Sequence, residues 1–419
     1  MKMSRILNNY HLKIRRDENL MRKIMYLFSS LGALVSLFGG KATSAPSLIA
    51  KGTSRREATN RSEFAKPSLA IFALNKYKII YLTQCFRPQI DAPSKEVVLL
   101  TNHFQGKIHD LHLDGYARCQ FSKRISSYPF LYYPLGFLPL FMAARKSILH
   151  LYTSLCDRPY LPYLPKRNMV VTSSNFFRRE RLHHKVKYLQ KAQTLVIQAE
   201  IQKPELLAAG MDERKIKVIY PAVDVEHFFY RKPAGPFTIL NASCPGKVRD
   251  LEKRGILLLL AADPLLAADP HLRDSRIKLL WREAEFPLFQ KKIKNQELNN
   301  IIVENKIHKD MNEQYAHVHA TIIPYLQLDE YLKLIPTTIM ESLAAGKPVL
   351  VSAPTGIAEV IRATKCGVVF EPSLSGLLSA IKELKKNYGT YQRRCRPTAE
   401  RYFSKERFLR EYEQIYAQI

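Results

Sequence analysis

The sequence of 419 residues contains few cysteines, and their spacing matches no disulfide or metal-binding pattern. Its six cysteines are scattered, without a C-x-x-C pair and without the His/Cys spacing of a zinc site. This distribution is typical of reduced thiols in a cytoplasmic protein. It therefore argues against a disulfide-stapled scaffold and against a zinc site.

Acidic residues are also scarce, because 37 Asp and Glu stand against 65 Lys and Arg, a formal net charge of +28. Such a field attracts nucleic acids, anionic membrane surfaces and phosphorylated substrates. The sequence lacks zinc-finger spacing and an aromatic RNP-like motif, so nucleic acid is the least favoured of these partners. Anionic lipid attracts Lys and Arg by about 1 kcal/mol per residue near the surface, which favours a membrane surface. A generally basic, solvated surface is the alternative.

The first 75 residues carry a short apolar run and little periodicity. Residues 24–40 form an uncharged run of 17 residues, whereas a spanning helix needs about 20. The basic start and the small residues at 42–45 resemble a secretory signal. Residues 52–66 are rich in Ser and Arg, which is typical of a linker. Three interpretations stay open, an anchor, a targeting peptide or a disordered extension, and we expect a cytoplasmic protein that is peripheral to or anchored at the membrane.

The remaining sequence alternates predicted strands and helices, which is typical of parallel sheets covered on both faces. The first series has strands at 78–82, 148–152, 169–173, 194–198 and 217–220, and helices at 94–100, 182–190 and 204–209. The second series has strands at 237–241, 277–280, 300–305, 320–324 and 348–351, and helices at 257–266, 339–344 and 408–416. Ser94 and Ser404 are predicted to cap helices. A chain of this length is expected to form two domains.

The most informative stretch covers residues 336–359. Four apolar residues at helical spacing predict a short helix, namely Ile339, Met340, Leu343 and Ala344. Gly346 is predicted to end this helix, because glycine tolerates positive φ. Residues 354–356 then turn the chain into a second helix, whose free N–H groups and partial positive charge suit a phosphate. Glu341 offers a carboxylate to sugar hydroxyls, so the stretch predicts half of a nucleotide-sugar site.

The run from Glu341 to Val349, followed by Gly356 and Glu359, resembles the donor-site signature of retaining GT-B glycosyltransferases of family four, the glycosyl transferases group 1 type. The family pattern is E-A-M-A-x-G-x-P-V-V followed by G-G-x-x-E. The resemblance implies an α/β fold of two doubly wound, Rossmann-like domains that face a cleft. An ordinary helix–strand–helix unit of a doubly wound sheet is the alternative, and it would not require Glu341.

The resemblance also implies a division of the chain. An N-terminal extension precedes an acceptor-side domain, a nucleotide-sugar-binding domain and a helix that packs back on the first domain. In chain order these are residues 1–75, 76–232, 233–396 and 397–419.

A basic loop in the second domain supplies candidate catalytic cations. In the resembling enzymes a G-R-x-x-x-x-K-G run neutralises the donor diphosphate, and Arg249, Arg254 and Gly255 match its spacing. A diphosphate leaving group needs cations, because negative charge develops as the glycosidic bond breaks. An arginine can bind it through two parallel hydrogen bonds. Lys247 and Lys253 compete for this role, and a solvated basic loop is the alternative.

The turn after the last motif strand is expected to bind the donor. The resemblance implies that Thr355, Gly356 and Ile357 contact it together with Glu341, and that Glu359 orients the turn. This would place the nucleotide ribose at Glu341 and the phosphates at the turn.

Two positions depart from the family pattern. Lys333 occupies the donor-site position where the family carries the first of two glutamates, which raises the prospect of an altered donor or an inactive relative. His150 is the candidate catalytic histidine, with a structural histidine as the alternative. The sequence has no D-x-D motif, and the resemblance implies no metal and no cofactor, with the nucleotide-sugar as co-substrate.

The implied activity is transfer of a sugar from a nucleotide-sugar donor to an acceptor hydroxyl with retention, by a metal-independent hexosyltransferase (EC 2.4). The expected partners are the donor, a glycan or lipid-linked acceptor, and an anionic membrane surface. The product would be a glycolipid, a cell-surface polysaccharide or another glycan. A catalytically silent GT-B protein that binds nucleotide or glycan is one alternative, and a basic nucleic-acid-binding protein is another, because fold alone does not fix the reaction.

Overall fold

The computed structural model describes residues 78–83, 86, 92–110, 125–127, 146–153, 168–176, 179–243, 248–281, 285–308, 310–328 and 332–419. These residues belong to one compact unit of the chain. The predicted extension 1–75 and its apolar run lie outside the described residues. The three interpretations offered for this extension therefore stay predictions.

The first sheet has seven described strands, which are all parallel and lie in the order β3-β2-β1-β4-β5-β6-β7. Their bounds are β1 Ile79–Thr83, β2 Lys107–Asp110, β3 Ile125–Ser127, β4 Ile148–Thr153, β5 Met169–Ser173, β6 Thr194–Ile197 and β7 Ile216–Val218. The chain starts in the middle, runs to one edge and then continues on the other side of β1, which is the doubly wound arrangement. Every residue of β1 and β5 is buried, as expected for strands covered on both faces.

The second sheet repeats this topology with six described strands in the order β10-β9-β8-β11-β12-β13. All five pairings are parallel. Their bounds are β8 Thr238–Asn241, β9 Arg276–Trp281, β10 Ile301–Asn305, β11 Ala320–Ile323, β12 Val349–Ser352 and β13 Gly367–Phe370. The strand order reverses between β8 and β11, and doubly wound sheets bind their ligands at the carboxyl ends of the strands beside this point.

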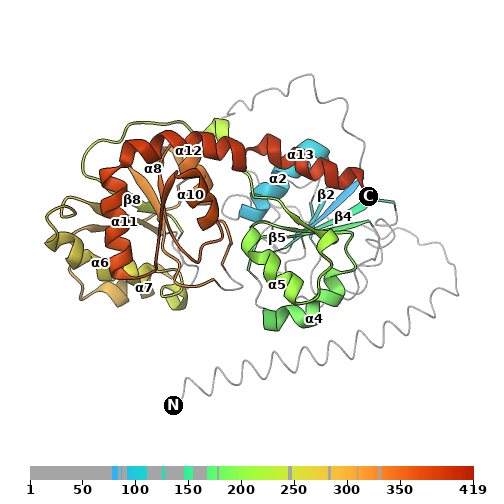
Figure 1. Cartoon of the computed structure of the whole chain (residues 1–419), viewed down its shortest axis with the longest axis horizontal. Coiled ribbons are helices and arrows are strands. Elements are labelled where there is room, and N and C mark those ends of the chain that lie inside the picture. Colours follow the sequence, from blue (N-terminus) through green and yellow to red (C-terminus); the bar gives the residue numbers. More distant parts are fainter. Residues whose placement is uncertain are drawn as a thin grey trace, which may run out of the picture. The chain divides into compact units, whose positions relative to one another are not determined.

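Where the structure describes the connection between two successive strands of one sheet, it contains a helix, because a crossover must return the chain to the same end of the sheet. Figure 1 shows these helices alongside the strands of each sheet. Their bounds are α2 Ala92–Phe104, α4 Arg179–Leu189, α5 Lys203–Ala208, α6 Ile256–Ala268, α7 Phe286–Ile293, α8 Asn312–Ala316, α9 Thr337–Ala344, α10 Ala358–Thr364, α11 Leu374–Lys386, α12 Tyr388–Phe403 and α13 Lys405–Ala417. The predicted strands and helices are confirmed, with shifts of a few residues at their ends.

One predicted cap is wrong and two other helix ends are confirmed. Ser94 does not cap the first helix, because α2 already begins at Ala92 and Ser94 is buried within its first turn. Ser404 caps α13, since its side-chain oxygen accepts a hydrogen bond from the backbone N–H of Arg407 at 3.4 Å. Gly346 ends α9 with φ +68°, and its N–H donates to the carbonyl of Leu343 at 3.0 Å.

The cores of the two sheets are built from different residues. The single tryptophan, Trp281 of β9, stacks on Phe289 of α7 at a ring separation of 4.0 Å in the core of the second sheet. The last helix, α13, joins the core of the first sheet through buried Tyr412 and Tyr416, which pack in one cluster with Tyr81 of β1. The chain therefore returns to the first sheet at its C-terminal end.

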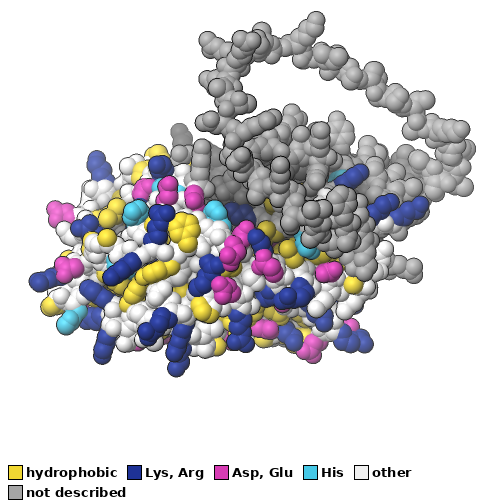
Figure 2. Space-filling view, turned by 90° about the horizontal axis from the view of Figure 1, so that it is seen from above, with side chains coloured by type: hydrophobic (Ala, Val, Ile, Leu, Met, Phe, Trp, Pro, Cys, Tyr) yellow, Lys and Arg dark blue, Asp and Glu magenta, His cyan; other side chains and the backbone are white. Residues whose placement is uncertain are grey.

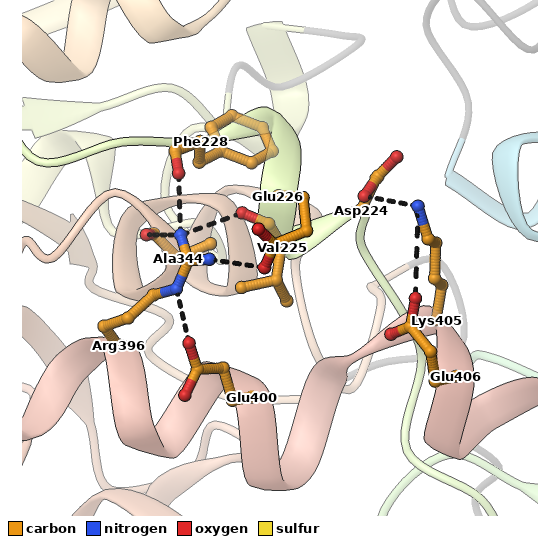
Figure 3. A network of polar contacts seen from close by, with 9 residues as sticks. All are labelled: Asp224, Val225, Glu226, Phe228, Ala344, Arg396, Glu400, Lys405 and Glu406. Atoms are coloured by element: carbon orange, nitrogen blue, oxygen red, sulfur yellow. Dashed lines mark hydrogen bonds and ion pairs between the residues drawn. The ribbon is translucent and has the colours of Figure 1, made fainter.

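Arg396 of α12 holds the connection that leads from β7 to β8. This connection contains a short 3-10 helix, η7 (Val225–His227), which lies against α12 and α9. The guanidinium donates to three backbone carbonyls and two carboxylates (Figure 3), with acceptors Val225 O at 3.0 Å, Phe228 O at 2.7 Å, Ala344 O at 3.3 Å, Glu226 Oε1 at 2.7 Å and Glu400 Oε1 at 2.8 Å. One side chain of α12 thus joins the connection to α9 and α12, two helices that pack with the second sheet.

Candidate functional site

The carboxyl ends of β8, β11 and β12 meet in a cluster of hydrogen-bonded side chains. Ser243 follows β8, Tyr325 follows β11 and Ser352 ends β12. The Ser243 Oγ and Tyr325 Oη atoms lie 3.2 Å apart, and the Ser352 hydroxyl donates to the Tyr325 carbonyl at 2.6 Å. This cluster stands at the point of strand-order reversal, where the sheet topology favours ligand binding.

Gly255 places Arg254 at this cluster. Gly255 is the N-cap of α6 and has φ +68°, and a Cβ there would lie 1.8 Å from the carbonyl oxygen of Pro324. Only glycine therefore fits where the start of α6 passes the end of β11. The close approach of these backbones presents the preceding residue, Arg254, to the carboxyl end of the sheet.

The Arg254 side chain is a candidate anion ligand. Its Nη1 donates to Ser243 Oγ at 3.3 Å, and its buried Nε has no hydrogen-bond partner among the described residues. A buried donor without a partner costs about 1–3 kcal/mol, which an anion that accepts its hydrogen bond would recover. The positive end of the 13-residue helix α6 adds to the attraction. Arg249 lies in the 3-10 helix η8 (Val248–Asp250), and its side chain is outside the described part, so its role stays a prediction.

Glu341 lies in α9 and is almost fully buried. Its Oε2 lies 3.0 Å from the hydroxyl oxygen of Tyr315 in α8, and its Oε1 lies 3.4 Å from Nζ of Lys95 in α2. A buried carboxylate requires such partners, because desolvation of an unpaired charge is costly. The structure therefore gives the predicted ribose-binding residue a fixed position.

The N-terminus of α9 is a feature that the sequence analysis missed. Pro336 is its N-cap and supplies no side-chain hydrogen bond. The hydroxyl of Thr338 in the first turn is buried and has no hydrogen-bond partner within the described ranges. The signal was the Thr337–Thr338 pair directly after a proline, because helix starts leave N–H groups that need acceptors.

The turn before α10 differs from the prediction. The N–H of Thr355 donates to Ser352 O at 3.0 Å, and the N–H of Gly356 donates to Leu334 O at 3.1 Å. These two amides are thus used within the protein, which corrects the expectation that the turn presents free N–H groups. A Cβ on Gly356 would lie 2.9 Å from the same Leu334 oxygen, so this glycine serves close approach. Ile357 is fully buried and packs in the core.

Lys333 precedes Leu334, whose carbonyl accepts from the turn, and Glu359 follows the turn in α10. Lys333 is half-buried and forms an isolated antiparallel bridge with Asn175, which follows β5. Glu359 is exposed in the first turn of α10. Their predicted contacts with a donor stay predictions.

His150 is placed away from solvent, which corrects its assignment as a catalytic residue. It is fully buried in β4, with Nδ1 at 2.6 Å from Tyr416 Oη and Nε2 at 2.8 Å from Thr172 Oγ1. Burial lowers the pKa of His150 to about 3, because the charged imidazolium would be desolvated. The ring is therefore neutral near pH 7, with both nitrogens engaged, and it acts as the structural histidine that the sequence left as the alternative.

The described residues show neither a metal cluster nor a spanning helix. Within the described ranges, no group of three or more His, Cys, Asp or Glu side chains is arranged to hold a metal ion. None of the helices in the same ranges has the length and apolar character needed to cross a bilayer. Metal independence stays a prediction.

A comparison with family models finds a match in the part of the chain that forms most of the second sheet. Residues 242–387 match the family described as glycosyl transferases group 1. This segment, about a third of the chain, is similar to members of that family. The matched segment contains Arg254, Glu341 and the turn at Gly356, and it supports the resemblance to group 1 glycosyl transferases that was drawn from the sequence. No curated protein matches the chain.

Several solved structures, some of them of glycosyltransferases, are similar to this chain over both sheets. HepE of Anabaena, solved with UDP and glucose, has a TM-score of 0.66 and 14% identity, and the match covers 82% of this chain and 100% of HepE. A glycosyltransferase from Rickettsia africae has a TM-score of 0.64 and 18% identity, covering 82% of this chain and 98% of that one. The lipopolysaccharide outer core galactosyltransferase WaaB has a TM-score of 0.60 and 12% identity, covering 82% and 100%. The likeness confirms the predicted GT-B fold.

Proposed function

We propose that this protein transfers a sugar from a nucleotide-sugar donor to an acceptor hydroxyl with retention of anomeric configuration. The observation that carries the proposal is Arg254, a cationic side chain at the strand-order reversal of the second sheet, whose buried Nε has no hydrogen-bond partner in the part of the chain that the structure describes. A diphosphate fits this position, because it offers several oxygens to a guanidinium and to a helix N-terminus. The family match of the same segment supports the proposal.

Arg254 and Glu341 would bind different parts of the donor, the diphosphate and the ribose. Arg254 and the N-terminus of α6 would neutralise the charge that develops on the leaving diphosphate, without requiring a metal. Glu341 would accept a hydrogen bond from the nucleotide ribose. The leaving phosphate would take the acceptor proton, so that the mechanism requires no separate general base.

A uridine nucleotide is the first donor to test. HepE has been solved with UDP, with UDP and glucose, and with UDP-glucose. These complexes are of HepE, which is 14% identical to this chain. The donor panel should therefore include UDP, GDP and ADP together with hexose conjugates of each.

A lipid-linked or glycan acceptor at an anionic membrane surface fits the charge distribution. The first 232 residues carry 38 Lys and Arg against 16 Asp and Glu, and thus hold most of the net charge of +28. Figure 2 shows Lys and Arg side chains spread over the described surface on the face in view. A basic surface is attracted to anionic lipid by about 1 kcal/mol per residue. We propose a cytoplasmic protein that meets its acceptor at the membrane, as part of glycolipid or surface-polysaccharide synthesis.

The test compares nucleotide binding by the full-length chain with that of two arginine variants. Arg254→Ala should weaken binding of the preferred nucleoside diphosphate at least tenfold, because it removes a charge-assisted contact of about 1.5–3 kcal/mol. The matched control is Arg276→Ala, an exposed arginine at the amino end of β9, which should bind like the wild type. Thermal shift and titration calorimetry report the affinity. Equal binding by wild type and Arg254→Ala would refute the proposed phosphate site.

A catalytically silent GT-B protein is the second candidate. Two observations favour it, namely Lys333 in place of the family glutamate and the buried, structural His150. An active enzyme should slowly hydrolyse its nucleotide-sugar even without an acceptor. Nucleotide binding that depends on Arg254, with no hydrolysis of any conjugate, would favour the silent protein.

A further inference from the structure

We propose that Tyr315 is a positioning residue that fixes the carboxylate of Glu341 so that only its Oε1 is presented to the nucleotide ribose. This inference rests on the proposed function, because it concerns the same donor site. Tyr315 matches no part of the motifs in the sequence, and only the fold brings it to Glu341.

The tyrosine ring is held firmly. Tyr315 lies in α8 and is 1% exposed. Its ring packs against Phe228 of the connection between the sheets, with centroids 6.0 Å apart at 73°. The hydroxyl oxygen lies 3.1 Å from the carbonyl of Thr338 and 3.0 Å from Glu341 Oε2. Both acceptors belong to α9, so the hydroxyl contacts the helix backbone and the carboxylate together.

This contact distinguishes the two carboxylate oxygens of Glu341. Oε2 shares the single proton of the buried Tyr315 hydroxyl with the Thr338 carbonyl, and the ring that carries this hydroxyl is immobilised by packing. Oε1 faces Nζ of Lys95 at 3.4 Å, and the Lys95 side chain is 45% exposed. A half-exposed ammonium at this distance is a weak partner, because solvent screens it. A ribose hydroxyl can therefore take its place at Oε1, whereas it cannot displace Tyr315 from Oε2.

Loss of the tyrosine hydroxyl should weaken binding of the nucleotide ribose without disturbing the fold. In Tyr315→Phe the ring still fills its place in the core, but the carboxylate is free to rotate and one buried oxygen loses its donor. The hydrogen bond between the ribose and Oε1 then weakens. We expect about tenfold weaker binding of the ribonucleotide, which corresponds to about 1.4 kcal/mol.

The experiment measures dissociation constants for UDP, 2′-deoxy-UDP and 3′-deoxy-UDP with the full-length wild type and with Tyr315→Phe, or for the matching set if GDP or ADP is the nucleotide bound. Tyr315→Phe should bind UDP about tenfold more weakly than the wild type. The deoxy nucleotide that lacks the hydroxyl bound by Oε1 should differ less than twofold between the two proteins. The matched control is Tyr391→Phe, which removes a tyrosine–glutamate hydrogen bond of 2.8 Å to Glu383 elsewhere in the second half.

The outcomes separate the inference from the proposed function. If the wild type binds none of UDP, GDP and ADP, the donor site is refuted and the inference falls with it. A second outcome is that the wild type binds, but Tyr315→Phe loses affinity by the same factor for UDP and both deoxy nucleotides, or loses none. This outcome overturns the positioning role alone. Loss of selectivity for the hydroxylated ribose in Tyr315→Phe, with an unchanged Tyr391→Phe, supports it.

Discussion

Removal of the Arg396 guanidinium should destabilise the second half of the chain by about 3 kcal/mol. The network in Figure 3 contains two kinds of contact, and their expected contributions differ. The carbonyls of Val225 and Phe228 accept at 3.0 and 2.7 Å, and a hydrogen bond from a charged donor contributes about 1.5–3 kcal/mol. The glutamates at 226 and 400 are 77% and 54% exposed, so each ion pair should contribute less than about 1 kcal/mol. The carbonyl contacts should therefore dominate.

Arg396→Met is the informative change, because it keeps most of the aliphatic stem and removes only the charged donor. The arginine side chain is 32% exposed, so water replaces part of what is lost, and we reduce the summed contribution of the carbonyl bonds to about 3 kcal/mol. The assay is urea unfolding followed by the fluorescence of Trp281, the single tryptophan, which lies in β9. The control is Arg393→Met, an exposed arginine on the same helix, which should change the free energy of unfolding by less than about 0.5 kcal/mol.

The glutamate variants decide whether this reasoning holds. Glu226→Gln and Glu400→Gln should each cost less than about 1 kcal/mol, and 1 M salt should leave the effect of Arg396→Met nearly unchanged. A double glutamine variant as unstable as Arg396→Met would show that the ion pairs dominate. Disappearance of the Arg396→Met effect in high salt would lead to the same conclusion and refute the assigned role of the carbonyls.

Three further predictions concern the site and the buried histidine. Gly255→Ala should lose about 2–5 kcal/mol of stability in the same fluorescence assay, because its Cβ meets Pro324 O at 1.8 Å and φ is positive; a loss below 1 kcal/mol would contradict the close approach. His150 has a folded-state pKa of about 3, below the ordinary 6.5, so the unfolded chain binds more protons and stability falls as the pH drops from 6.5 toward 3. His150→Gln should reduce the slope of the unfolding free energy by up to about 1.4 kcal/mol per pH unit between pH 6 and 4.5, and equal slopes would argue against a neutral buried ring. Lys95→Met should change the dissociation constant of the preferred nucleotide less than fivefold, whereas a loss above twentyfold would mean that Lys95 binds the nucleotide and is not merely displaced from Glu341.

Local patterns allowed the helices and strands, and the candidates for a donor site, to be predicted from the sequence. The end of α9 at Gly346 depends on one residue that tolerates positive φ, and the start of α13 depends on the hydroxyl of Ser404 three residues before the N–H that it accepts from. The strands could be found because both faces of a parallel sheet are buried and its strands are short apolar runs. Arg254 was a candidate because the run from Arg249 to Gly255 resembles the diphosphate-binding run of the family. Each of these signals lies within a few neighbouring residues.

The errors arose where contacts join distant parts of the chain. The N–H of Gly356 donates to the carbonyl of Leu334, 22 residues earlier. The sequence therefore suggested free N–H groups at this turn, whereas the fold supplies an acceptor. His150 looked available because its partners, Thr172 and Tyr416, come from another strand and from the last helix. Spacing along the chain carries no information about such pairs.

The sequence by itself determined the two series of alternating elements and the resemblance of the second segment to group 1 glycosyl transferases, because periodicity, glycine positions and motif spacing are local properties. Only the tertiary structure decided which polar groups remain available for a ligand. In the fold His150 is buried, the N–H of Gly356 donates to a backbone carbonyl, and Tyr315 contacts Glu341. Burial and hydrogen bonding of this kind depend on which elements the sheets and crossovers place side by side.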